Sequence, residues 1–136
     1  MQKIDVMVDW AGTNYGGHWT YPDMGIVVST AKTWEGFKKD FNEALDFHLE
    51  GLEEDGDPLP QWAIDRDYEI EYHLGTAALL RRAEEYTTLK AISRASGLKL
   101  SVLKKYASAE VYPRAEQREK IVNALRAIAK ELLSFK

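Results

Sequence analysis

The sequence predicts an α+β fold in two parts, a β-β-β-α-β domain followed by an all-α domain, and two observations support this. Apolar residues recur with a period of two over most of the first part, and with a period of about three and a half after Gly75. The net charge reverses at nearly the same place. Residues 1–73 hold 16 acidic and 5 basic side chains, a net charge of −11, whereas residues 74–136 hold 6 and 13, a net charge of +7. We therefore predict an acidic domain over residues 1–74 and a basic domain over residues 75–136.

The first part is predicted to contain four strands and one helix. Every second side chain in residues 4–10 is apolar, which predicts a strand with one apolar face made of Ile4, Val6, Val8 and Trp10. Residues 18–21 and 26–30 are predicted as the next strands, because turn-forming residues separate them. Thr33 is predicted to cap a helix. Its apolar stripe consists of Trp34, Phe37, Phe41, Leu45, His48 and Leu52. A loop over residues 53–62 precedes the fourth strand, predicted at residues 67–72.

The second part is predicted to contain four helices. Thr76 and Thr88 are placed to cap the first two, which extend to about Tyr86 and about Ala95. The third covers roughly residues 100–108, and the fourth roughly residues 114–135.

Residues 89–106 have the spacing of a helix-turn-helix. Gly97 stands where the turn requires a positive φ, and Ser93, four residues earlier, is small enough for two helices to cross closely. With Leu98, Leu103 and Tyr106 turned inward, the second helix presents a polar and basic surface. The predicted DNA-binding residues on this surface and beyond it are Lys99, Ser101, Val102, Lys104, Lys105 and Arg114. The alternative is an α-hairpin whose lysines form a solvated face.

Several segments give the chain a resemblance to HicB-type antitoxins of type II toxin-antitoxin systems. They are His73-Leu-Gly-Thr-Ala-Ala-Leu-Leu, the helix-turn-helix segment, Tyr106-Ala107-Ser108, Pro113-Arg114, and the segment that begins with residues 117–121 and ends with residues 130–134. The resemblance implies an incomplete RNase H-like domain, which is not a nuclease, followed by an all-α helix-turn-helix domain. It further implies that the first domain binds and occludes a small basic HicA-type toxin that cleaves mRNA. The second domain would bind operator DNA as a homodimer or higher homo-oligomer and repress the operon. The chain departs from the family pattern at Leu100, Ala109, Glu110, Val111 and Tyr112.

Aromatic and acidic residues near the first hairpin are the predicted contacts to the toxin, because aromatic side chains beside acids suit a basic partner. They are Tyr15, Trp19, Tyr21 and Asp23. The alternative for the aromatic residues is packing in the core. A different class of function is a self-standing helix-turn-helix regulator whose acidic domain senses a ligand or dimerises.

A third class is a metal-dependent nuclease in which Asp5 and Asp9 act with Asp23 or Glu43. Alternating acids on a strand are the ordinary composition of a solvated sheet face, so the sequence predicts a protein that is not an enzyme. None of the three histidines has a second histidine at ligand spacing. We therefore predict no catalytic residue, no metal and no cofactor.

The composition indicates a folded protein of a reducing compartment. The chain of 136 residues is 45% hydrophobic and contains no Cys, which excludes disulfides and thiolate metal sites. No segment approaches the roughly 20 apolar residues that span a bilayer, and the N-terminus has no signal-peptide core. The prediction is a soluble, cytoplasmic protein.

Overall fold

The computed structural model describes residues 1–136 and divides into two compact units. The first unit contains residues 1–9 and 13–75, and the second contains residues 10–12 and 76–136. The first unit is built from β1 (Gln2–Trp10, whose last residue belongs to the second unit), β2 (Tyr15–Tyr21), β3 (Gly25–Ala31), α1 (Trp34–Glu54), α2 (Gln61–Ile64) and β4 (Tyr68–Leu74). The second contains α3 (Thr76–Ala83), α4 (Leu89–Ser96), α5 (Leu100–Ala107) and α6 (Ala115–Ser134).

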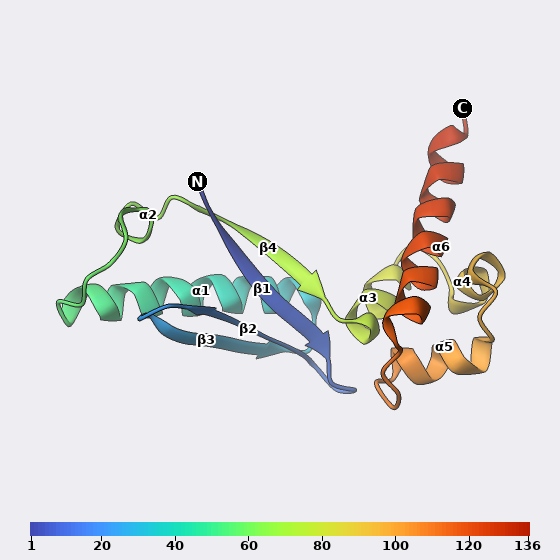
Figure 1. The fold of residues 1–136 in the computed structure, drawn as a ribbon, viewed down its shortest axis with the longest axis horizontal. Helices are drawn as coiled ribbons and strands as arrows, with labels where there is room; N and C mark the ends of the chain where they lie inside the picture. The colour runs from blue at the N-terminus through green and yellow to red at the C-terminus, as the bar shows by residue number, and fades with distance from the viewer. The chain divides into compact units, whose positions relative to one another are not determined.

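The sheet of the first unit has the strand order β3-β2-β1-β4 (Figure 1). β2 and β3 form an antiparallel hairpin, whereas β1 and β4 are parallel, with Ile4 opposite Ile70 and Val6 opposite Tyr72. A parallel pair needs a long crossover connection. Here α1 and α2 lie in the connection that brings the chain back to β4.

The core of the first unit lies between the sheet and α1. The alternating residues Ile4, Val6 and Val8 of β1 are buried, as the sequence predicts. They face an apolar stripe on α1 that is fully buried and consists of Phe37, Phe41, Leu45 and Leu49. The predicted cap of α1 is confirmed, because the Gly36 amide donates to the Thr33 hydroxyl at 3.0 Å.

Gly17 lets α1 approach the sheet closely. A Cβ atom at this position would lie 2.6 Å from Cζ of Phe37 and 2.9 Å from the carbonyl oxygen of Met7. Any larger residue would displace either the strand or the helix, so the glycine of β2 is required by packing.

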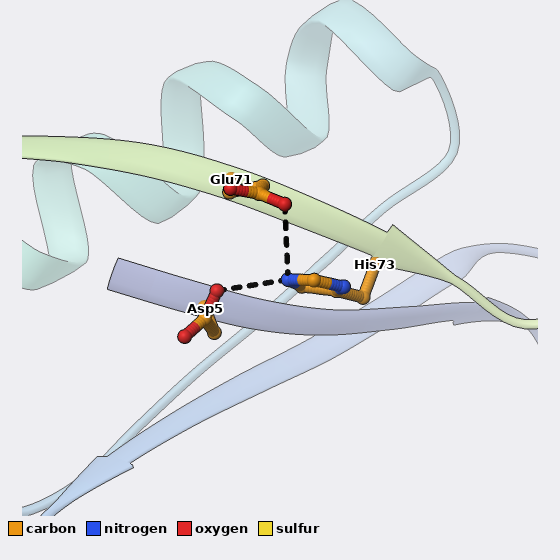
Figure 2. Close-up of side chains that lie close together, drawn as sticks. All are labelled: Asp5, Glu71 and His73. Carbon is orange, nitrogen blue, oxygen red and sulfur yellow. Dashed lines mark hydrogen bonds and ion pairs between the residues drawn. The ribbon is translucent and has the colours of Figure 1, made fainter. Parts of the chain in front are cut away.

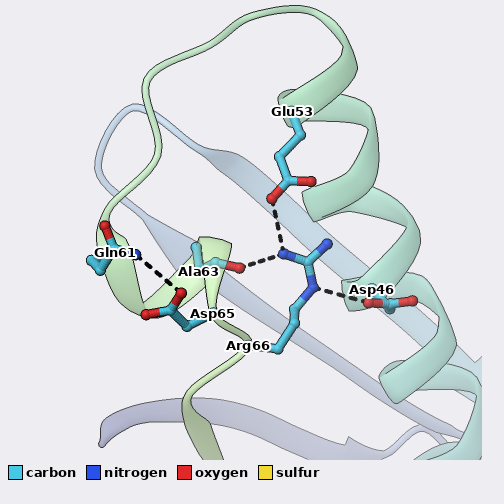
Figure 3. Close-up of polar contacts among 6 residues, drawn as sticks. All are labelled: Asp46, Glu53, Gln61, Ala63, Asp65 and Arg66. Carbon is cyan, nitrogen blue, oxygen red and sulfur yellow. Dashed lines mark hydrogen bonds and ion pairs between the residues drawn. The ribbon is translucent and has the colours of Figure 1, made fainter.

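Arg66 joins the segment before β4 to α1 (Figure 3). Its Nε donates to Oδ1 of Asp46 at 3.1 Å and its Nη1 donates to Oε1 of Glu53 at 3.4 Å and to the carbonyl of Ala63. Burial alone would lower the pKa of Arg66, but the hydrogen bond to Asp46 and the charge of Glu53 outweigh it and raise the pKa. Arg66 thus neutralises the charge of two carboxylates in a strongly acidic region. It also holds α2 against α1. The sequence predicts a loop over residues 53–62, so the helix α2 at Gln61–Ile64 was not expected.

The second unit is organised around α6. Its core consists of Leu80, Ile92, Leu103, Tyr106, Ile121 and Ala124, which come from all four helices. The predicted cap of α4 is confirmed, since the Ala91 amide donates to the Thr88 hydroxyl at 3.0 Å. Gly97 has the predicted positive φ, 76°, and Ser93 Oγ donates to the carbonyl of Leu98 at 2.5 Å across the turn.

The predicted fold class, an incomplete RNase H-like domain followed by an all-α helix-turn-helix domain, is wrong. The structure has a four-stranded mixed sheet and six helices, but after β4 there is no separate all-α helix-turn-helix domain. The chain ends in one long helix, and the second unit also takes Trp10–Gly12 from the end of β1. The physical reason is that α3, α4 and α5, with eight residues each, are too short to form a core of their own and share one core with the 20-residue α6.

The position of Trp10 also differs from the prediction. The alternation in β1 predicts that it packs with Ile4, Val6 and Val8. It is buried but belongs to the second unit, where the guanidinium of Arg81 lies 3.5 Å from the centre of the Trp10 ring.

Candidate nucleic-acid and protein-binding surfaces

The helix pair α4–α5 presents a basic surface. Leu103 and Tyr106 point into the core and fix the orientation of α5. Its polar residues are consequently on the outside, and the exposed ones among the predicted DNA-binding residues are Lys99, Ser101, Lys104 and Lys105. Arg114, at the N-cap of α6, is exposed as well. No acidic side chain occurs within α4 or α5. Such a surface attracts phosphate groups.

Val102 does not belong to this exposed surface. It is half-buried and packs against the core of the second unit, so only part of its side chain is accessible from outside. Leu100, which departs from the family pattern, is half-buried too. Lys90 and Arg94, which are not among the predicted DNA-binding residues, are exposed on α4 and add to the positive charge of the helix pair. Their helical spacing from the buried Ile92 was the available signal.

The turn after α5 contains a strained residue. Ala109 has a φ of 64°, in the left-handed region that favours glycine. The following Glu110 and Tyr112 are exposed.

The predicted toxin-binding residues occupy two different environments. Tyr15 and Trp19 are buried, with 2% and 4% of their surfaces exposed, and they face α1. They are core residues, so the prediction that they contact a partner is corrected. Tyr21 is half-buried in an aromatic cluster, 5.4 Å from Trp62 between ring centres. Only Asp23, in the β2–β3 turn, is exposed, and it has a φ of 63°.

The face of the sheet opposite α1 carries exposed apolar and charged side chains side by side. We call it the open sheet face, and its exposed or half-buried residues include Lys3, Asp5, Met7, His18, Ile26, Val28, Glu69, Glu71 and His73. Met7, Ile26 and Val28 are each at least half exposed. Apolar side chains on a solvated face next to carboxylates are typical of a surface that binds another protein.

Three residues of the open sheet face form a compact polar cluster (Figure 2). Nε2 of His73 lies 2.8 Å from Oδ1 of Asp5 and 3.7 Å from Oε1 of Glu71. Nζ of Lys3 lies 3.3 Å from the other oxygen of Glu71, Oε2. Asp5 and Glu71 face each other across the parallel β1–β4 pair, and His73 follows two residues later on the same face of β4. The cluster was not predicted from the sequence, because Asp5 lies far from Glu71 and His73 in the chain.

The nuclease site considered from the sequence does not form. Asp5 and Asp9 are four residues apart on one strand, which separates them by about 13 Å at about 3.3 Å per residue. Glu43 lies on α1, which covers the opposite face of the sheet from Asp5. The other histidines are elsewhere, since His48 contacts the carbonyl of Met24 at 2.5 Å and His18 lies on β2.

Comparison with family models, with curated proteins and with solved structures gave no match. No helix of the chain combines the length and the apolar character needed to cross a bilayer.

Proposed function

We propose that the protein is an antitoxin whose acidic first unit binds and occludes a small basic toxin and whose basic second unit binds operator DNA. The observation that carries the proposal is the division of charge between two separately packed units, −11 in residues 1–73 and +7 in residues 74–136. A single nucleic-acid-binding protein would have no use for a strongly acidic half, because it repels phosphate. The resemblance to HicB-type antitoxins leads to the same proposal.

The open sheet face supports binding of a basic protein. Its acidic side chains at β1 and β4 favour lysines and arginines, and the exposed Ile26 and Val28 on β3 supply apolar contact area. Binding there would place the first unit over the active site of an RNA-cleaving toxin and exclude RNA. The inhibition is stoichiometric, and no residue of this chain performs catalysis.

The α4–α5 pair supports binding of DNA. Lys99, Lys104 and Lys105 are exposed around α5, where they are available to phosphates and base edges of a major groove. Two copies acting together would place two α5 helices about 34 Å apart on the duplex. Repression of the operon that encodes the protein and its toxin follows from occupancy of the operator.

A groove between α3 and α6 supports self-association of the second unit. It has a volume of about 330 Å³ and apolar walls that include Leu79, Leu125, Ile128 and Leu132. Figure 1 shows the C-terminal turns of α6 extending beyond the other helices of its unit. The exposed Leu132, Leu133 and Phe135 of these turns match the apolar groove, so a second copy is the proposed occupant.

Replacing Leu132 by aspartate is expected to convert the dimer to a monomer, because the substitution places a charge in an apolar groove. Sedimentation velocity would measure the change. Val111→Asp is the matched control, since Val111 is an exposed apolar residue of the same unit that neither lines the groove nor lies near the C-terminal turns of α6. If the parent protein sediments as a monomer, or if the two variants behave alike, the groove is not the site of self-association.

Affinity purification of the tagged chain from its native cells at low salt tests the function. Charge-driven complexes persist at low ionic strength. We expect one small basic protein in equimolar amount, and we expect this protein to cleave RNA. Recovery of the chain alone, or with DNA only, would contradict the antitoxin function and favour the self-standing regulator.

A further inference from the structure

We propose that Asp5, Glu71 and His73 form a binding site for a divalent transition-metal ion, with zinc as the preferred ion. The site lies on the open sheet face, but the proposal does not rest on the proposed antitoxin function. It rests on the donor set and on the spacing of the donor atoms.

The spacing of the donor atoms fits one ion. The three candidate ligand atoms, Oδ1 of Asp5, Oε1 of Glu71 and Nε2 of His73, all lie within 4.8 Å of one another. Zinc holds nitrogen and oxygen ligands at about 2.1 Å in a tetrahedron, so neighbouring ligand atoms lie about 3.4 Å apart. The His73 nitrogen is 2.8 Å from Asp5 and 3.7 Å from Glu71, values on either side of this separation. Small side-chain rotations therefore suffice to admit the ion (Figure 2).

The negative charges of the cluster favour a bound cation. The two carboxylates are register partners on adjacent strands, where their negative charges repel each other. Lys3 pairs with Oε2 of Glu71 and not with Oε1, so it can orient this carboxylate while the other oxygen faces His73. Contacts of this kind, from a residue that is not itself a ligand, commonly orient metal ligands.

Solvent can complete the coordination of the ion. Asp5 and Glu71 are exposed and His73 is half-buried. Three protein ligands leave the fourth zinc position open, and water has access to it.

The donor set selects among metals. An imidazole together with two carboxylates suits zinc and neighbouring transition metals, whereas magnesium prefers oxygen ligands and keeps several water molecules. We therefore expect zinc to bind at least about ten times more tightly than magnesium at this site.

Isothermal titration calorimetry of the full chain with zinc chloride, in a buffer that does not bind metals, tests the proposal. The variants are Glu71→Gln and His73→Gln, and Glu69→Gln is the matched control because it removes the same charge from the same face of β4. All three positions are exposed or half-buried, so the substitutions leave the core intact, and circular dichroism would confirm the fold.

We expect one zinc ion per chain, with affinity reduced at least about tenfold in Glu71→Gln and in His73→Gln and unchanged in Glu69→Gln. Magnesium at the same concentrations should give no comparable heat. Absence of zinc binding would overturn the proposal. Equal losses in Glu71→Gln and Glu69→Gln would overturn it too, because they would show a general effect of negative charge and not a defined site.

Discussion

Reversing the charges of Lys104 and Lys105 together is expected to abolish DNA binding in the physiological salt range. Both side chains are exposed on α5. The logarithm of the affinity falls linearly with the logarithm of the salt concentration. Each lysine that neutralises a phosphate makes this fall steeper by about 0.9. Lys104→Glu with Lys105→Glu should therefore reduce the steepness of the salt dependence by about 2. The affinity should fall by about 100-fold or more, because each glutamate also repels the DNA backbone. Fluorescence anisotropy with a duplex of mixed sequence measures both quantities without knowledge of the operator.

The matched control is Lys38→Glu with Lys39→Glu. These lysines are also adjacent on a helix, α1, and their reversal changes the net charge by the same amount, but they lie in the acidic unit. The control is expected to change the affinity by less than about threefold, through net charge alone. If both double variants lose affinity equally, the α4–α5 pair is not the DNA-binding surface.

Replacing Phe37 by alanine is expected to lower the free energy of unfolding of the first unit by about 3–5 kcal/mol, the range observed for buried aromatic residues. Phe37 is fully buried and its ring stacks on Trp34 and Phe41, at 5.9 and 6.1 Å between ring centres. Gly17 packs against the same ring, so the cavity left by the substitution would lie between α1 and the sheet. Urea unfolding followed by tryptophan fluorescence measures the change.

Phe47→Ala provides the comparison, since Phe47 lies on the same helix but is 78% exposed. Its removal is expected to change stability by no more than about 0.5 kcal/mol. Similar losses in the two variants would mean that the buried stripe of α1 has been assigned incorrectly.

The local features of the fold were predictable from the sequence because short-range physics decides them. Alternation of apolar residues identified β1 and its buried face, and the period of α1 identified Phe37, Phe41 and Leu45 as core residues. The caps at Thr33 and Thr88 depend on one side chain and an amide three residues away, so they too could be recognised.

Features that depend on contacts between distant segments could not be predicted in the same way. The cluster of Asp5, Glu71 and His73 exists only because β1 pairs with β4 in one particular parallel register. The burial of Tyr15 and Trp19 depends on the position of α1 over the β2–β3 hairpin, and their types suit an interface as well as a core. The inclusion of residues 10–12 in the second unit likewise depends on packing between distant segments and not on periodicity.

The measurement that tests the central claim most directly is the inhibition of the copurified basic protein by this chain. Cleavage of a labelled RNA by that protein would be followed while the chain is added in increasing amounts. If the acidic unit occludes the active site stoichiometrically, cleavage should fall in proportion to the chain added and end at one equivalent. The double variant of Lys104 and Lys105 should inhibit equally well, because its changes lie in the other unit. Undiminished cleavage in the presence of excess chain would contradict the account.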